Sequence, residues 1–82
     1  MKTGQHVNLI VRDDPESYIS GIYACEDHFH YFIVISPGGL TQILTFSKSA
    51  WYLEKTDGFT DIHGFLEDQK EYIKALYGLM IK

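Results

Sequence analysis

The sequence is poor in cysteine and proline and has no long apolar run. Its one cysteine, Cys25, cannot form an internal disulfide, whereas secreted domains of this size usually carry several. The apolar run from Val7 to Val11 is too short for the hydrophobic region of a signal peptide, and no segment approaches the length of a transmembrane helix. These features lead us to expect a cytoplasmic protein without membrane contact.

Basic residues are also scarce. Seven Lys and Arg residues stand against 11 Asp and Glu residues, so the formal net charge is −4. Binding to duplex DNA depends on how many phosphates a protein neutralises, and the basic residues here are scattered without forming a stripe. We therefore expect no binding to duplex DNA, while a local basic site stays compatible with the composition.

The sequence also lacks recognisable catalytic motifs. It has no nucleophile elbow, no His-Glu-x-x-His zinc motif and no phosphate-binding loop. Its paired acids, at residues 13–14 and 26–27, fall in predicted turns, where acidic residues are common. A chain of 82 residues forms one small domain, residues 1–82, and such a domain rarely encloses a substrate cavity. We expect no enzymatic activity and no cofactor.

Aromatic and β-branched residues, in contrast, are abundant and fall in short runs. Val7, Leu9 and Val11 recur at every second position and predict a half-buried strand over residues 5–12. The same pattern predicts four more strands, over residues 18–26, 29–36, 40–46 and 51–53. Turn signals separate the strands at residues 13–17, 26–28, 37–39 and 47–50, and a loop is expected at residues 55–58. The run over residues 29–36 is the densest and is expected to be the most buried.

Gly21 lies in the middle of the second run. A glycine inside a strand pattern is typical of a sharp bend or of a close approach between two backbones. Small five-stranded barrels need such a bend in order to close, and five strands are too few for a sandwich. The sequence therefore predicts a mainly β fold, with a five-stranded antiparallel SH3-like barrel over residues 4–54.

The last segment has a different pattern. From Asp61 onward, apolar residues recur in steps of three and four, which predicts an amphipathic helix over residues 60–81 with Thr60 as its N-cap. We expect this helix to cover an open end of the barrel, over Trp51 or Phe46. Its apolar residues span more than one face, so part of its surface is free to pair with a second copy or with another protein.

Several residues of the predicted barrel resemble the Sm-like family. Its first motif opens with Gly-x-x-Val-x-hydrophobic, matched here by Gly4, Val7 and Leu9. A bent strand with a glycine follows, and then hydrophobic-x-x-x-Asp-x-aromatic, matched by Tyr23, Asp27 and Phe29. Where the bacterial branch has Tyr-Lys-His-Ala, this chain has Ser-Lys-Ser-Ala at residues 47–50. The resemblance covers Gly4 to Glu54.

The resemblance implies a ring-shaped homo-oligomer in which the fourth and fifth strands pair between subunits, and a site for single-stranded RNA in the loops before the third and fifth strands. The residues it implies for the RNA site are Asp27, His28, Phe29, His30 and Lys48. An aromatic ring that stacks a base, beside a cation that contacts phosphate, is the usual basis of single-strand binding. The expected oligomer interface comprises Ile43, Phe46, Trp51, Tyr72 and Tyr77.

Simpler roles compete with these functional ones. Asp27 suits a turn in which its side chain bonds backbone amides. Phe29 opens a strand that is predicted to be buried, and aromatic residues at such positions usually belong to the core. Lys48 suits a turn in which its side chain is solvated. Cys25, His28 and His30 match no specific zinc spacing, so no metal site is expected.

Two functional hypotheses follow. The first is a non-enzymatic Sm-like barrel that forms a homo-oligomer and binds single-stranded RNA. The alternative is a protein-interaction module, an adaptor or small regulator, on the same SH3-like barrel without RNA binding, since one fold hosts many functions. A small-molecule or metal-binding protein that uses the His and Cys residues is a third and weaker interpretation.

Overall fold

A strongly curved antiparallel sheet forms the body of the computed structural model, which describes residues 1–36 and 39–81 but no side chains from residue 76 onward. Its strands are β1 (Gln5–Val11), β2 (Asp14–Glu26), β3 (His30–Ile35), β4 (Gln42–Ser47) and β5 (Trp51–Phe59). Two helices follow, α1 (His63–Asp68) and α2 (Lys70–Ile81). The predicted mainly β fold with a helical C-terminus is confirmed. The turn predicted at Pro37 and Gly38 lies outside the described residues.

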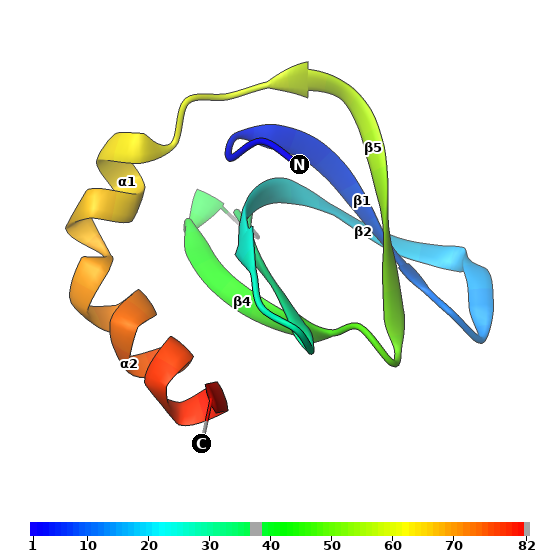
Figure 1. Ribbon diagram of the computed structural model, residues 1–82. Coiled ribbons are helices and arrows are strands. Elements are labelled where there is room, and N and C mark those ends of the chain that lie inside the picture. The colour runs from blue at the N-terminus through cyan, green and yellow to red at the C-terminus, as the bar shows by residue number, and fades with distance from the viewer. Residues whose placement is uncertain (37–38, 82) are drawn as a thin grey trace.

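The strand order in the sheet is β4-β3-β2-β1-β5. Each neighbouring pair is antiparallel. The sheet therefore has two edges, β4 and β5, and no ladder joins them in the described part of the chain. The two helices lie outside the curve, beside β4 (Figure 1). Within residues 1–36 and 39–81, neither helix has the length and apolar character that crossing a bilayer requires.

The concave side of the sheet holds the first of two apolar clusters. This inner cluster consists of Val7, Leu9, Tyr23, Ile33 and Phe46, and none of them is more than 7% exposed. Half-buried side chains complete it: Tyr31, Ile35, Trp51 and Leu53. The rings of Phe46 and Trp51 meet edge to face, with their centroids 5.1 Å apart, so the end of β4 packs against the start of β5.

The second cluster lies on the convex side. This outer cluster consists of Ala24, Phe32, Val34, Ile43 and Ile62, and the half-buried helical residues that pack against it are Phe65, Leu66 and Ile73. The helices therefore cover the outer cluster, and the expectation that they cover Trp51 or Phe46 is wrong. The reason lies in β3, because Ile33 faces the inner cluster while Phe32 and Val34 face outward and need a cover of their own. Three of the six residues of β3 are buried, and so are three of the seven of β1, so the strand predicted to be the most buried is buried to about the same degree as the first.

Gly21 of β2 lies closely against β3, the neighbouring strand of the sheet. A Cβ atom at this position would stand 2.4 Å from Cγ2 of Ile33 and 3.1 Å from the carbonyl oxygen of Val34. Both distances are too short for a side chain to fit without moving its neighbours. The predicted close approach of two backbones is therefore present, and it falls where the curved sheet brings the fully buried Ile33 inward.

Two strands are longer than predicted. β2 begins at Asp14, because Val11 and Asp14 pair across a two-residue turn, and Pro15 is tolerated there near the start of the strand. β5 continues through the predicted loop to Phe59, which pairs with Gln5 across a register shift. At this shift Gly58 has φ of +120°, and the Gln5 side-chain amide donates to the carbonyl oxygens of Thr56 at 2.6 Å and Gly58 at 3.1 Å. The glycine marks a bulge in a strand.

The helical segment also differs from the prediction, which places one helix over residues 60–81 with Thr60 as its N-cap. The first helix begins at His63, and residue 62 is its N-cap, without a side-chain capping bond. The second helix starts after Gln69, and nothing in the sequence pattern explains this break. Thr60 is held elsewhere, because its N–H donates to the carbonyl oxygen of Gly4 at 2.9 Å.

The N-terminus ties the strands to the helical segment. The Gly4 N–H donates to the carbonyl oxygen of Tyr23 at 2.9 Å, and the Thr3 hydroxyl donates to that of Ala24 at 2.8 Å. Together with the bond from Thr60 to Gly4, these contacts join the residues before β1, the bent part of β2 and the linker that leads from β5 to α1.

Substituting Gly21 with alanine should destabilise the fold. The added Cβ has no room against β3, and overpacking of this kind usually costs about 1–3 kcal/mol. Gly64→Ala is the matched control, since a Cβ there meets nothing within 4 Å and the better helix propensity of alanine should add up to about 1 kcal/mol. Urea denaturation of both variants checks this, and equal midpoints for Gly21→Ala and the unchanged chain would contradict it.

Candidate binding site at the two adjoining turns

The turn between β2 and β3 is organised by the Asp27 carboxylate. Its Oδ1 accepts the backbone N–H of Phe29 at 2.8 Å and of His30 at 2.6 Å, and the Asp27 N–H donates to the carbonyl oxygen of His30 at 3.0 Å. Burial alone would raise the pKa of this carboxyl, but the two backbone donors, helped by His30 and Lys48 nearby, lower it below the usual aspartate value. Asp27 is thus the structural centre of the turn.

Phe29 lies at the tip of this turn, outside the strand. β3 begins one residue later, at His30, so the prediction that the strand starts at Phe29 is wrong, because Asp27 holds the Phe29 amide in the turn. The Phe29 side chain is 70% exposed. Its ring lies 6.3 Å from that of His28, between centroids, in an edge-on arrangement. A large apolar ring is therefore presented to solvent.

His30 points back toward the turn. Its Nδ1 lies 3.6 Å from Oδ1 of Asp27, beyond hydrogen-bond distance, and this nitrogen is shielded from solvent with no hydrogen-bond partner. Its backbone faces Ser47 of β4 in the sheet. The His30 side chain is thus half-buried beside Asp27, with 28% of it exposed.

The turn between β4 and β5 is held by its serines. The Ser47 hydroxyl lies 2.7 Å from that of Ser49 and accepts the Ser49 N–H at 3.3 Å, while the Ala50 N–H donates to the carbonyl oxygen of Ser47 at 3.2 Å. Arg12 of the β1–β2 turn donates from Nε to the carbonyl oxygen of Lys48 at 2.8 Å. The predicted break in the strand pattern at residues 47–50 is confirmed as a turn.

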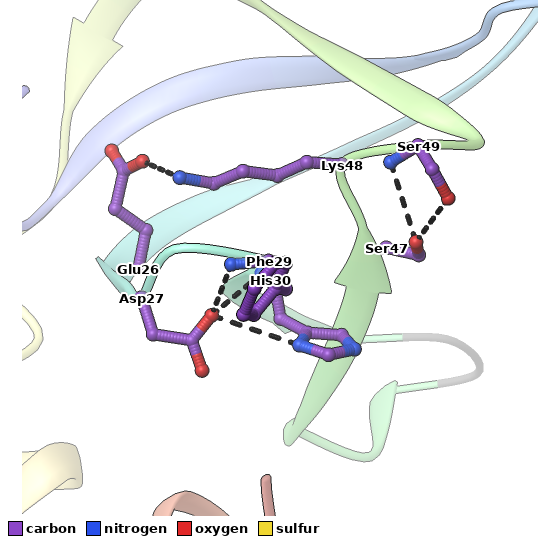
Figure 2. Close-up of polar contacts among 7 residues, drawn as sticks. All are labelled: Glu26, Asp27, Phe29, His30, Ser47, Lys48 and Ser49. Atoms are coloured by element: carbon purple, nitrogen blue, oxygen red, sulfur yellow. Dashed lines mark hydrogen bonds and ion pairs between the residues drawn. The ribbon is translucent and has the colours of Figure 1, made fainter. Parts of the chain in front are cut away.

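These two turns touch each other through Lys48 (Figure 2). The Lys48 backbone N–H donates to the carbonyl oxygen of Phe29 at 2.8 Å. Its side chain reaches back across the turn, where the ammonium pairs with Oε2 of Glu26 and lies 5.1 Å from the centre of the Tyr31 ring. Main chain and side chain of one residue therefore link both turns.

Glu26 is held from two sides. Its Oε2 accepts from Lys48, and its Oε1 accepts the Tyr23 hydroxyl proton at 2.9 Å. The bond from Lys48 lowers the pKa of Glu26, with a smaller contribution from Tyr23, against the opposing effect of burial. Burial, together with the Glu26 carboxylate, raises the pKa of Tyr23. The carboxylate is thus ionised at neutral pH and oriented by a side chain of the inner cluster.

An open hollow of about 410 Å³ lies between the turns. Its lining consists of Glu26, Asp27, His28 and Lys48. The structure therefore brings together the five residues that the resemblance assigns to an RNA site, although only Asp27, His28 and Lys48 of these five line the hollow. Sequence reasoning missed Glu26 as a partner of Lys48, along with Tyr23 and Tyr31, because a pattern of alternation does not reveal which side chains meet across 22 residues.

The residues expected at an oligomer interface lie mostly within the core. Ile43 is 3% exposed in the outer cluster and Phe46 is 7% exposed in the inner one, and Trp51 is half-buried against Phe46. Tyr72 is 49% exposed on α2, and the side chain of Tyr77 lies outside the described residues. An interface along β4 would use its backbone edge and the exposed Leu44.

The His and Cys residues do not form a metal site in the described part of the chain. Across residues 1–36 and 39–81, no three side chains of His, Cys, Asp or Glu gather closely enough to hold a metal ion. Cys25 is half-buried against the outer cluster, and burial raises the pKa of its thiol. Its surroundings are therefore those of a small apolar side chain.

Comparisons with known proteins add no family assignment. Neither a scan against protein-family models nor searches of curated proteins and of solved structures found a match to this chain.

Replacing Asp27 with alanine should destabilise the chain in a pH-dependent way. The change removes the acceptor of two turn amides, which should lower the free energy of unfolding near neutral pH by about 1–2 kcal/mol. Since folding lowers the pKa of Asp27, this stabilisation is complete above the unfolded aspartate pKa of about 3.9 and disappears as the pH falls through the folded pKa.

Urea denaturation at neutral pH and again well below the unfolded aspartate pKa measures both effects. The difference in the free energy of unfolding between Asp27→Ala and the unchanged chain should become smaller at the acidic pH. Asp57→Ala, at an exposed position of β5, serves as the control. If this difference in free energy of unfolding were the same at both pH values, the ionised Asp27 carboxylate would be ruled out as the acceptor of the turn amides.

Proposed function

We propose that this chain is a non-enzymatic Sm-like protein whose sheet forms the wall of a small SH3-like barrel, that it assembles with further copies of itself, and that it binds single-stranded RNA weakly at the two adjoining turns. The observation that carries this proposal is the contact between those turns. Residues 26–29 and 47–50 meet through Lys48 and place the exposed Phe29 ring and the Lys48 ammonium at one end of the sheet.

This arrangement suits a single strand better than a duplex. An exposed aromatic ring stacks an unpaired base whatever its sequence, and one nearby ammonium neutralises one phosphate. The surrounding charge limits the affinity, because Glu26 and Asp27 line the same hollow as Lys48 and the chain as a whole carries −4. We therefore infer weak binding that depends more on Phe29 stacking than on phosphate contacts.

The two sheet edges support self-assembly. β4 and β5 stand at opposite ends of the strand order, and an unpaired edge presents backbone N–H and C=O groups that another strand can pair with. If the β4 edge of one copy pairs with the β5 edge of the next, the pair still has one unpaired β4 edge and one unpaired β5 edge, so further copies can add in the same way. Such a head-to-tail contact closes into a ring when the rotation between copies permits it.

The second candidate function is a protein-interaction module without an RNA role. It is favoured by the pairing of Lys48 with Glu26, which neutralises the one cation lining the hollow. With Glu26 and Lys48 paired, the Asp27 carboxylate leaves the hollow negative, and such a hollow fits basic or polar groups of a protein surface better than it fits phosphate. The exposed apolar side chains Phe29, Leu44 and Tyr72 offer further contact area for a protein.

Short oligouridine or oligoadenosine should bind, and both turns should contribute. Phe29→Ala should weaken binding by about 1–3 kcal/mol, roughly 5- to 150-fold, through lost stacking. Lys48→Ala should lower the slope of log affinity against log salt, but by less than the value of about 0.7 for a complete phosphate contact, because the ammonium is shared with Glu26. Fluorescence anisotropy at several salt concentrations measures both, with Lys55→Ala, an exposed lysine of β5, as control. Equal affinities for all three variants and the unchanged chain would exclude this site.

The assembly is checked by native mass in solution. We expect a hexamer or heptamer, and Leu44→Lys should reduce its mass because it places a charge on exposed β4, whereas Tyr72→Lys on α2 should leave it unchanged. Both positions are exposed in the single chain, 37% and 49% respectively, so neither change should unfold it. A monomer would contradict ring assembly, and loss of mass only in Tyr72→Lys would support the interaction module.

A further inference from the structure

The Lys48 ammonium already has an anionic partner within its own chain. It pairs with Oε2 of Glu26 and lies over the Tyr31 ring at 5.1 Å. Only about a quarter of its side chain is exposed, against 37% for Glu26. The ammonium therefore lies against the sheet in this conformation, with a carboxylate in the place that an external anion would take.

The carboxylate is oriented by a residue of the inner cluster. The Tyr23 side chain is 6% exposed, and its hydroxyl donates to the second oxygen of Glu26 at 2.9 Å. Glu26 itself ends β2, where its backbone pairs with Tyr31. The strand and the tyrosine together restrict where the carboxylate can go, so the ion pair is a prepared contact and differs from two long surface side chains that meet by chance.

From this geometry we propose that Glu26 is a built-in competitor that restrains Lys48, so that nucleic-acid phosphate reaches the ammonium only by displacing the Glu26 carboxylate. The inference rests on the proposed RNA function of this site and adds its regulation. A carboxylate and a phosphate oxygen make the same charge-assisted contact with an ammonium. In the free chain the Lys48 ammonium is therefore occupied by Glu26, and a ligand that offers only phosphate gains little affinity from this lysine.

The first arm of the test measures the restraint without RNA. Acetylation of amines by an N-hydroxysuccinimide ester, followed by mass spectrometry, compares Lys48 with the exposed Lys55 in the same sample. Lys48 should react severalfold more slowly in the unchanged chain, and the ratio should approach one in Glu26→Gln. An unchanged ratio in Glu26→Gln would overturn the restraint directly.

The second arm measures binding of short oligouridine by the same variants. Glu26→Gln should bind about fivefold more tightly, which is what the loss of one partly exposed ion pair allows. Its salt slope should also rise, toward the value of about 0.7 for a complete phosphate contact of Lys48. Tyr23→Phe keeps every charge but removes the bond that orients Glu26, and it should gain part of the same increase. Glu54→Gln, on β5, removes an equal charge elsewhere and should leave the slope unchanged.

The outcomes separate the two ideas. If the unchanged chain binds and Glu26→Gln has the same affinity and slope, the competitor is overturned and the RNA site stands. If Lys48 becomes reactive in Glu26→Gln but no variant binds oligonucleotide, the proposed function fails and the competitor has nothing to regulate. If Glu54→Gln gains as much as Glu26→Gln, the effect is one of net charge, which also overturns the competitor.

Discussion

The architecture depends on a strand that is apolar on both of its faces. β3 sends Ile33 into the inner cluster and Phe32 and Val34 into the outer one, and a sheet with one wet face would leave half of it in water. The curved sheet encloses the first face, and the C-terminal helices cover the second through Ile62, Phe65 and Leu66. The helices are therefore a required second layer, since 82 residues provide little other apolar surface to bury.

Much of this fold could be predicted from local pattern. The five strands and the helical tail follow from apolar spacing. Gly21 indicates the close contact of β2 with β3, because no side chain fits there. The two strands that are longer than predicted share one cause, because proline and glycine occur near strand ends and at bulges as well as in turns. Pro15 was expected in a turn and lies near a strand start, and Gly58 was expected in a loop and lies at a bulge, because pairing with β1 decided both.

The candidate site was predictable only in part. A family resemblance pointed to the two turns, and spacing placed Asp27 in one and Lys48 in the other. Phe29 is exposed because its amide donates a hydrogen bond to the Asp27 carboxylate and so lies in the turn. The pattern of apolar residues does not reveal this bond. The pairing of Glu26 with Lys48 depends on how the curved sheet brings distant turns together, so it appears only when the chain is seen in three dimensions.

The hydrogen bond between Gly4 and Thr60 joins the residues before β1 to the linker that follows β5. Gly4 bonds to the bent part of β2 on one side and to the linker before α1 on the other, so the start of β1 and the beginning of this linker are held together. Fraying at the start of β1 would therefore break a contact that positions the linker to the helices.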